Sequence, residues 1–550
     1  MARASALPGR STPDETQKPP GSLRARFLRA WPWWVSFMVA LLTTAPYVRG
    51  ALHANAAWAF TGFLFAVDDG LSYIAKMRLG AQGAWCFRTP YTTEPALGLP
   101  AFGSYILLGH FLAPRAPYHA FLGLFQAFRL VALVGLVAAL HRVLAWIFPG
   151  RPGVQSLVAL WTLLGGGLGW LLYPLGWGHL AGWAPLSFYA PEAFGFLAVW
   201  GLPHLTAARG LWLYGWWAYA HRHYGRALVA AGAILLFQPL YIVPLALLWL
   251  GSTWFDRGTA GPERSRLLVL GLGFTLWTAY WGYMLWARTV DPVVRAWDAQ
   301  NNVRMVPWGA LALAYGPWLP WVIVGGRALA QTRPRVTRPV LLWLAAIAVL
   351  IWLPTSVQRR LLEGVWWAWG VFTAAALFVR MPSPAAQRSR AWTWLPFGLA
   401  ALSPIILWTT AWRAAGHPQE PIFRPRAEVE AMEAWAREVP LAAGVLASYP
   451  SSIALPAYAP VRAPVGHPVE SPAWAARRVQ VRAFFQPDTP EAQRRAWLKA
   501  WRVDYLWWGP RERALGAWDP RTAAGYEPVF HQGAYWVFRV PDSEATARFP

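Results

Sequence analysis

The chain has 550 residues, of which 56% are hydrophobic and only 13% are charged, and its mean hydropathy is +0.29. Soluble domains carry about 25% charged residues, so this composition excludes an ordinary soluble protein. Many apolar runs reach the roughly 20 residues that cross a bilayer, which predicts a polytopic α-helical membrane protein. The net charge of +24 does not indicate a nucleic-acid partner, because the arginines are spread through the loops between apolar runs. The single cysteine excludes an intramolecular disulfide.

The N-terminal part of the chain predicts a tail, one membrane span and a long external loop. Residues 1–30 begin with a Pro- and Ser-rich stretch and predict a disordered tail, which the arginines at its end hold on the cytoplasmic side. The first span is predicted over 31–48, and the first external loop over 50–118. This loop is too apolar to be fully solvated, so its segments 51–67 and 97–112 predict helices at the membrane interface.

Further apolar runs extend this membrane domain over 31–412, with about eleven membrane helices, the N-terminus inside and the C-terminus outside. The run 226–251 is broken by Gln238-Pro239 and has basic residues on both sides, which predicts a hairpin of two short helices. A single span is the alternative and would invert every later segment. The Arg-rich loops around 327–338 and 380–390 favour the hairpin, because both then lie inside. The other spans are predicted over 120–148, 154–173, 193–220, 267–287, 308–324, 340–353, 365–379 and 392–412.

After residue 412 the composition becomes charged and Pro-rich, which predicts a small α/β domain over 413–550 on the external side. Helix signals and alternating apolar residues define its expected elements. Helices are predicted over 428–439 and 491–501, and strands over 444–449, 503–508, 528–531 and 534–540, the last two forming a hairpin around Gln532-Gly533.

Two adjacent acids, Asp68 and Asp69, follow the first long apolar segment. Carboxylates near a bilayer cost free energy unless they are solvated, paired or used in chemistry. One interpretation is a solvated helix cap. The other is the centre of an active site, because two neighbouring carboxylates raise the pKa of one of them, which suits a proton acceptor. The sequence leaves open which of the two would act as the base.

Four further side chains stand where a phosphate or an acceptor would be held. Arg359 and Arg360 lie in a predicted outer loop and suit bidentate contact with a phosphate, with contact to lipid headgroups as the alternative. Glu192 stands at the outer end of a span, either as a first-turn residue that complements the helix dipole or as a second acidic ligand. His204 lies well within a predicted span, either as a structural residue or as a phosphate contact.

Other charged residues carry weaker signals. Lys76 and Arg78 are predicted to lie on the solvated face of an amphipathic helix, with phosphate contact as the alternative. His467 and Glu470 lie between Pro-rich turns of the tail, and His-x-x-Glu spacing outside a helix is weak evidence for a metal site. We interpret them as part of a structural or acceptor-facing loop.

The layout and several short motifs resemble the GT-C superfamily of integral-membrane glycosyltransferases, the group of protein O-mannosyltransferases and aminoarabinose transferases, and more particularly a bacterial branch of it. The resemblance covers most of 25–412 in layout. The motifs that carry it are Asp68-Asp69…Tyr73, Gly83-x-Trp85, Pro191-Glu192-Ala193-Phe194, Pro203-His204, Gln358-Arg359-Arg360, Glu363-Gly364 and Gly466-His467-Pro468-Val469-Glu470-Ser471.

This resemblance implies transfer of a sugar from a polyprenyl-phosphate donor to a lipid, glycan or protein acceptor, on the external face of the plasma membrane and with inversion at the sugar. One of the two aspartates would be the general base, while Arg359, Arg360 and His204 would hold the donor phosphate. Glu192 would be an auxiliary acid or a metal ligand, since members of the superfamily differ in their need for a divalent metal ion.

Two other classes of function compete with this reading. A transporter or lipid flippase would be favoured by inverted repeats or by paired charges at mid-membrane. A non-catalytic scaffold would be favoured if the acidic pair faced bulk water. An enzyme requires instead a cleft in which Asp69 faces Arg359 or Arg360.

Overall fold

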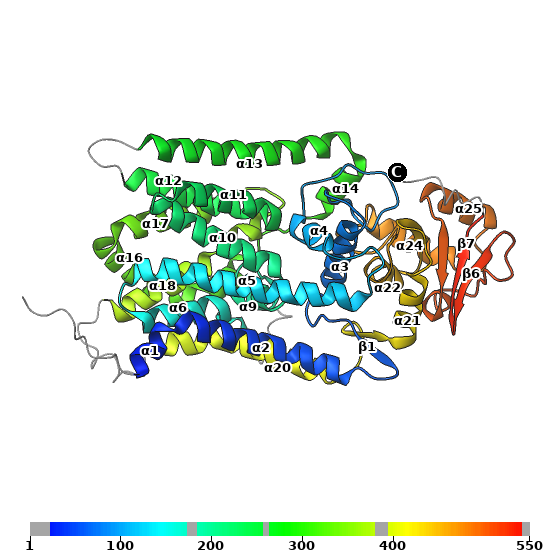
Figure 1. Cartoon of the computed structure of the whole chain (residues 1–550), viewed down its shortest axis with the longest axis horizontal. Coiled ribbons are helices and arrows are strands. Elements are labelled where there is room, and N and C mark those ends of the chain that lie inside the picture. Colours follow the sequence, from blue (N-terminus) through cyan, green and yellow to red (C-terminus); the bar gives the residue numbers. More distant parts are fainter. Residues whose placement is uncertain (1–22, 173–183, 257–262, 380–393, 542–550) are drawn as a thin grey trace, which may run out of the picture.

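The computed structural model describes residues 23–172, 184–256, 263–379 and 394–541. Long helices run side by side, with a small sheet at one end of them and the short helix α1 (Leu23–Arg29) at the other (Figure 1). Among the described residues, six helical segments are long and apolar enough to cross a membrane, and three shorter apolar helices accompany them. The chain thus has the architecture of a helical membrane protein, while the total of about eleven membrane helices stays a prediction.

The long helices and their connecting turns come from most of the chain before residue 416. Residues 380–390, one of the basic loops used above for orientation, lie outside the described residues. The helices are α2 (Trp31–His53), α5 (Tyr118–Ile147), α6 (Pro152–Leu164), α8 (Leu186–Tyr189), α9 (Gly195–Gly201), α10 (Pro203–Ala220), α11 (Tyr224–Phe237), α12 (Ile242–Phe255), α13 (Arg264–Val290), α14 (Pro292–Gln300), α15 (Trp308–Tyr315), α16 (Leu319–Thr332), α17 (Pro334–Leu350), α18 (Val365–Phe378) and α20 (Leu395–Ala415), with the 3-10 turns η1 (Leu168–Leu172), η2 (Pro239–Tyr241), η3 (Gly316–Trp318) and η4 (Gln358–Leu362).

The predicted hairpin agrees with the structure. Helices α11 and α12 are separated by the turn η2, where Pro239 has no N–H to continue a helix. The start of α11 and the end of α12 both lie beside the start of α13, because Tyr224 Oη donates to Glu263 at 3.0 Å and Arg266 pairs with Asp256 at 3.0 Å. The turn η2 therefore lies at the opposite end of the bundle.

Two predicted spans are interrupted. The segment 193–220 forms two helices that break at Leu202, because Pro203 lacks the N–H of a helix interior and instead begins α10. The placement of His204 well within a span was therefore wrong, since it lies in the first turn of α10. The segment 154–173 is helical only as far as α6, after which three glycines lead into η1.

The first external loop differs from its prediction. Residues 51–67 do not form one helix, because they leave α2, form the short strand β1 (Trp58–Phe60) and turn into α3 (Val67–Ala81). Strand β1 pairs antiparallel with β2 (Phe423–Pro425), a partner more than 350 residues away in the sequence that periodicity cannot reveal. The segment 97–112 contains only the short helix α4 (Gly103–Gly109).

The C-terminal part is built on a five-stranded mixed sheet in the order β4-β3-β5-β7-β6. Strand β3 is parallel to β4 and β5, whereas β7 is antiparallel to β5 and β6. All six predicted elements are present within a few residues, while α22, α23, α24, α26 and β4 were missed. The elements are α21 (Arg426–Trp435), β3 (Ala443–Leu446), α22 (Tyr449–Ser452), α23 (Leu455–Tyr458), β4 (Val461–Arg462), α24 (Trp474–Phe484), α25 (Glu491–Ala500), β5 (Tyr505–Trp508), α26 (Pro510–Arg513), β6 (Glu527–Gln532) and β7 (Tyr535–Arg539).

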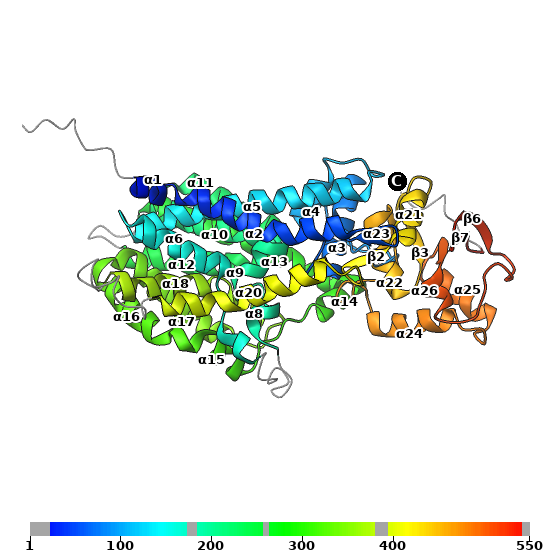
Figure 2. The same ribbon diagram turned by 90° about the horizontal axis from the view of Figure 1, so that it is seen from below.

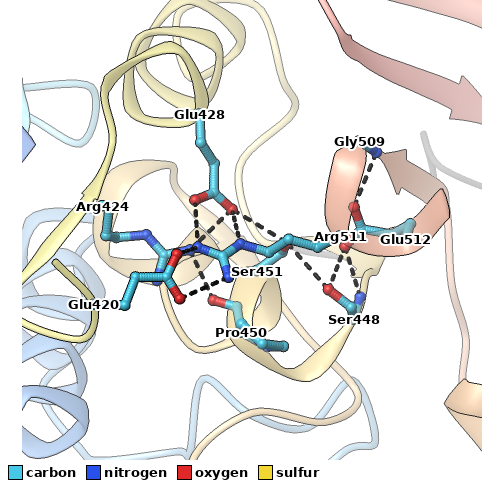
Figure 3. Close-up of polar contacts among 9 residues, drawn as sticks. All are labelled: Glu420, Arg424, Glu428, Ser448, Pro450, Ser451, Gly509, Arg511 and Glu512. Atoms are coloured by element: carbon cyan, nitrogen blue, oxygen red, sulfur yellow. Dashed lines mark hydrogen bonds and ion pairs between the residues drawn. The ribbon is translucent and has the colours of Figure 1, made fainter. Parts of the chain in front are cut away.

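In both views the helix α22 lies between the long helices and the strands β6 and β7 (Figures 1 and 2). A buried ionic network ties this C-terminal domain together (Figure 3). Glu428 of α21 has no exposed surface, and its Oε1 lies 2.9 Å from Arg424 Nη2 and 3.1 Å from Arg511 Nε. Arg511 also binds Glu420, in the segment that leads from α20 to β2, with Nη1 3.0 Å from Glu420 Oε2. The buried Glu428 carboxylate thus bridges two arginines from different parts of the domain, and Glu420 supplies the second negative charge.

We expect Glu428→Ala to lower the free energy of unfolding by about 3–5 kcal/mol, because it removes the shared partner of two largely buried arginines. The control is Glu430→Ala on the same helix, whose side chain is 54% exposed and 4.0 Å from Arg426. An exposed pair of this kind contributes less than about 1 kcal/mol. Unfolding of the full-length protein in detergent, followed by tryptophan fluorescence, measures both, and equal losses would contradict the role of the network.

Candidate active site

A cavity of about 230 Å³ lies between helix α3 (Val67–Ala81) and the long helices. Its wall comes from parts of the chain that are far apart in sequence: the first turn of α3, the segment before α9, the start of α10, the turn η2 and the turn η4. Five of the eight predicted site residues line it, namely Asp69, Glu192, His204, Arg359 and Arg360. The other three, Asp68, His467 and Glu470, do not line it and instead belong to contacts between α3 and the C-terminal domain.

The local structure of α3 fixes where the acidic pair stands. The residue before the helix adopts a left-handed conformation and serves as its N-cap, so neither Asp68 nor Asp69 is the cap that the first interpretation required. Both lie in the first turn, where the helix dipole favours negative charge. Gly70 lets this turn pack closely, because a Cβ there would come within 2.4 Å of the Phe63 ring.

The two carboxylates have different surroundings. Neighbouring residues on an α-helix point about 100° apart, and only Asp69 lines the cavity, with a side chain that is 47% exposed. Asp68 Oδ2 instead accepts a hydrogen bond from Tyr449 Oη of the C-terminal domain at 2.7 Å. The pair is therefore not a proton-sharing dyad, and the rise in pKa that was expected for one of the two carboxylates is not found at Asp69.

The imidazole of His467 is the hydrogen-bond partner of Asp69. His467 Nε2 lies 3.2 Å from Asp69 Oδ1. Burial alone would raise the pKa of Asp69, but the hydrogen bond and charge of His467, with Lys76 and His204 nearby, hold it below its ordinary value. Burial alone would lower the pKa of His467, but the hydrogen bond to Asp69 and the charges of Glu470 and Asp69 raise it. Asp69 is therefore ionised at neutral pH.

The prediction that Lys76 and Arg78 lie on a solvated face was wrong, because the C-terminal domain covers this side of α3. Lys76 is fully buried, and its Nζ lies 2.6 Å from Glu470 Oε1, which also accepts a hydrogen bond from Ser72 Oγ at 2.7 Å. Arg78 donates from Nε to the carbonyl of Ala457 at 2.7 Å. Both cations thus connect α3 to the C-terminal domain and do not face the cavity.

The two arginines of η4 have separate partners. Arg359 Nε pairs with Glu192 Oε1 at 2.8 Å, and Arg360 Nη2 donates to Asn301 Oδ1 at 2.9 Å. Glu192 precedes α9 by three residues, so the alternative that it complements the dipole from a first turn is wrong. Glu363, considered above only within a motif beside the arginines, pairs with Arg209 of α10 at 2.5 Å.

Arg209 was missed by the sequence analysis. A signal for it existed, since an arginine inside an apolar run is rare and almost always faces the interior of a bundle. His204, five residues earlier on the same helix, shares a hydrogen bond between Nδ1 and Tyr105 Oη at 2.7 Å. Its ring is therefore fixed by a residue of the first external loop while its side chain contributes to the cavity wall.

The donor set of the cavity does not fit a metal ion. Within the described part of the chain no group of three or more His, Cys, Asp and Glu side chains could hold one. The two carboxylates that line the cavity are each engaged by another residue, Asp69 by His467 and Glu192 by Arg359. We therefore derive the function below without a metal-dependent step.

No family model matches this chain, and no curated protein sequence matches it. Among solved structures, the apo oligosaccharyltransferase of Archaeoglobus fulgidus is similar over 88% of this chain and 70% of its own, with 14% identity and a TM-score of 0.49. ArnT from Cupriavidus metallidurans bound to undecaprenyl phosphate is similar over 92% and 97%, with 14% identity and a TM-score of 0.43. The arabinofuranosyltransferase AftD from mycobacteria is similar over 92% of this chain and 40% of its own, with 13% identity and a TM-score of 0.46. All three are GT-C glycosyltransferases. At this level of identity, an activity has to be argued from the site itself.

The pair of Asp69 and His467 predicts a pH-dependent contribution to stability. Because the pKa of His467 is raised from 6.5, its contribution is complete below about pH 6.5 and is lost as the pH rises through the higher, folded-state pKa. Because the pKa of Asp69 is lowered from 3.8, its contribution is present above about pH 4 and is lost as the pH falls through the lower, folded-state pKa.

We therefore expect wild type to exceed His467→Gln in stability mainly between about pH 4 and 6.5, with the difference shrinking above that range. Solvent screens the pair at the half-exposed Asp69, so the difference is about 1 kcal/mol or less. Unfolding temperatures of both proteins from pH 4 to 9 measure it, and a difference that grows with pH would contradict the assignment.

Proposed function

We propose that this protein is a GT-C-type glycosyltransferase that moves a sugar from a polyprenyl-phosphate donor to an acceptor, with inversion at the sugar. One observation carries the proposal: a single cavity has a carboxylate, Asp69, on the wall formed by α3, and two guanidinium groups, Arg359 and Arg360, on the wall formed by η4. A departing phosphate requires cations or N–H donors to stabilise its negative charge, and a nucleophilic hydroxyl or amine requires a base to take its proton. The cavity contains both.

In the proposed reaction the acceptor oxygen or nitrogen attacks C1 of the sugar from the side of Asp69. The bond from C1 to the phosphate oxygen breaks, and its electron pair leaves with the polyprenyl phosphate. Asp69 takes the proton of the acceptor, because it is ionised at neutral pH and is exposed to the cavity. Arg359, Arg360 and His204 stabilise the departing phosphate, since guanidinium groups bind phosphate oxygens in pairs.

Asp68 has a different role in this proposal. Its carboxylate is engaged by Tyr449 and does not line the cavity, so it orients the C-terminal domain over the site rather than accepting a proton. His467 then keeps Asp69 ionised and pointed at the acceptor. The Glu470 pair with Lys76 holds the same loop in place. The C-terminal domain thus acts on the cavity through its contacts with α3 and contributes no residue to the cavity wall.

The reaction would take place on the external face of the plasma membrane. Helix α3, whose residue Asp69 lines the cavity, lies at the end of the bundle that carries the C-terminal domain, whereas the basic helix α1 lies at the other end (Figure 1). Basic segments beside membrane helices favour the cytoplasmic side. The scaffold reading required an acidic pair that faces bulk water, and the position of Asp69 at the cavity wall argues against it.

Transfer from a radiolabelled polyprenyl-phosphate-sugar panel into the lipid and glycan fraction of the host tests the proposal. We expect Asp69→Asn to lower kcat by about 10²- to 10⁴-fold, the usual contribution of a general base. We expect a much smaller loss for the matched variant Asp68→Asn, which changes the same kind of residue one position away. Full activity in Asp69→Asn, or no transfer by well-folded wild type from any donor, would refute the proposed function.

The cavity wall formed by η4 carries both arginines and is called the phosphate wall here. A change in this wall is predicted to weaken binding of the donor and not of the acceptor. We expect Arg360→Gln to raise KM for the donor by about tenfold or more, because it removes a charge-assisted phosphate contact worth roughly 1.5–3 kcal/mol. The control is Arg304→Gln, an exposed arginine in the loop that follows α14, which should leave both constants within about twofold of wild type. Initial rates at varied donor and acceptor concentrations separate the two KM values, and an effect confined to the acceptor would contradict the assigned role.

A further inference from the structure

A buried ion pair lies directly behind the phosphate wall of the cavity. Arg209 Nε binds Glu363 Oε1 at 2.5 Å, and Arg209 Nη2 binds Glu363 Oε2 at 2.9 Å, so the contact is bidentate. The two side chains are 7% and 2% exposed, and neither residue lines the cavity. A charged pair in this position is costly to bury unless its remaining donors and acceptors are also satisfied.

The remaining donors and acceptors of the pair go to segments that do line the cavity. Arg209 Nη2 also donates to the carbonyl of Pro191, and Nη1 donates to the carbonyl of Phe194 at 3.3 Å, which holds the segment that carries Glu192. Glu363 accepts a hydrogen bond from the hydroxyl of Tyr241, at the tip of the α11–α12 hairpin.

Glu363 itself follows η4 directly and is thus linked through the backbone to both phosphate-binding arginines. The turn that aims it inward depends on Gly364, which has φ +82° and whose Cβ, if present, would come within 2.6 Å of Trp212. One ion pair therefore connects three parts of the cavity wall: the segment with Glu192, the turn η2 and the turn η4.

We propose that Arg209 and Glu363 are positioning residues that hold these three segments in one arrangement, so that Arg359 and Arg360 meet the donor phosphate together. We call the pair of Arg209 and Glu363 the clamp. That the ligand is a donor phosphate rests on the proposed function, whereas the clamp rests only on the contacts described above. Arginine is required rather than any cation, because four contacts to two carboxylate oxygens and two carbonyls need the planar fork of a guanidinium. Lysine keeps the charge but cannot reach all of them.

Hydrogen exchange of the full-length protein tests the clamp without any ligand. We expect Arg209→Lys to accelerate amide exchange in residues 189–194, 238–241 and 357–364 together. The matched control is Arg266→Lys, because Arg266 is also buried and pairs with Asp256 at 3.0 Å, but at the opposite end of the hairpin. It should leave all three segments unchanged. Acceleration in only one segment, or in none, would overturn the clamp.

Binding of undecaprenyl phosphate without a sugar tests the consequence for the donor site. We expect Arg209→Lys to raise its Kd about tenfold or more and Arg266→Lys to leave it within twofold, with both variants folded. In an Arg360→Gln background, Arg209→Lys should add little, because both changes remove the same phosphate contact and their effects are then not additive.

The outcomes separate the two proposals. Joint acceleration of exchange with an unchanged Kd would overturn the positioning role for the phosphate and leave the pair as a purely structural contact. Failure of wild type to bind undecaprenyl phosphate would refute the proposed donor, while the exchange measurement would still decide whether the clamp exists.

Discussion

The rest of the structure depends on one constraint, which is that the charged side chains of helix α3 are bound by residues from the far end of the chain. Asp68 and Asp69 in its first turn, and Lys76 and Arg78 on its later turns, all have partners between residues 449 and 470. Docking of the C-terminal domain buries the two cations of α3, and the same domain supplies the Glu470 carboxylate and the carbonyls of residues 457 and 458 that bind them. The burial of α3 and the docking of the C-terminal domain are therefore coupled.

This dependence explains why an ionic contact serves here better than an apolar one. A buried ion pair adds little net stability compared with an apolar contact of similar size. Its geometry, however, is satisfied in only one register of α3 against the C-terminal domain. Lys76 Nζ lies 2.6 Å from Glu470 and 4.1 Å from the centroid of the Phe102 ring, so a shift of α3 by one residue would break both contacts. The same shift would turn Asp69 by about 100° away from the cavity. The pair thus fixes the direction of the carboxylate rather than the strength of the interface.

Much of this arrangement was predictable from local sequence. The remainder was not predictable, and each failure has a physical reason. Apolar runs and turn residues predicted most of the long helices, the α11–α12 hairpin and six elements of the C-terminal domain. Contacts between distant segments were not predictable, since nothing local in the sequence indicates that β1 pairs with β2 or that Lys76 is covered by the loop with Glu470. Short motifs found five residues that line one cavity. They did not find Arg209, because its role depends on contacts with three segments that meet only in the folded chain.

The electrostatics of the cavity also constrain how the proposed transfer would proceed. An aspartate whose pKa is held below its ordinary value is a weak base, so it cannot drive attack by a hydroxyl group that has not yet begun to lose its proton. The driving force must then come from the departure of the phosphate, which the guanidinium groups of η4 assist. Arg359 is already paired with Glu192 at 2.8 Å, so a donor phosphate has to share or displace that carboxylate. In the proposed reaction, bond breaking at the sugar would therefore run ahead of proton transfer, and Asp69 would receive the proton late.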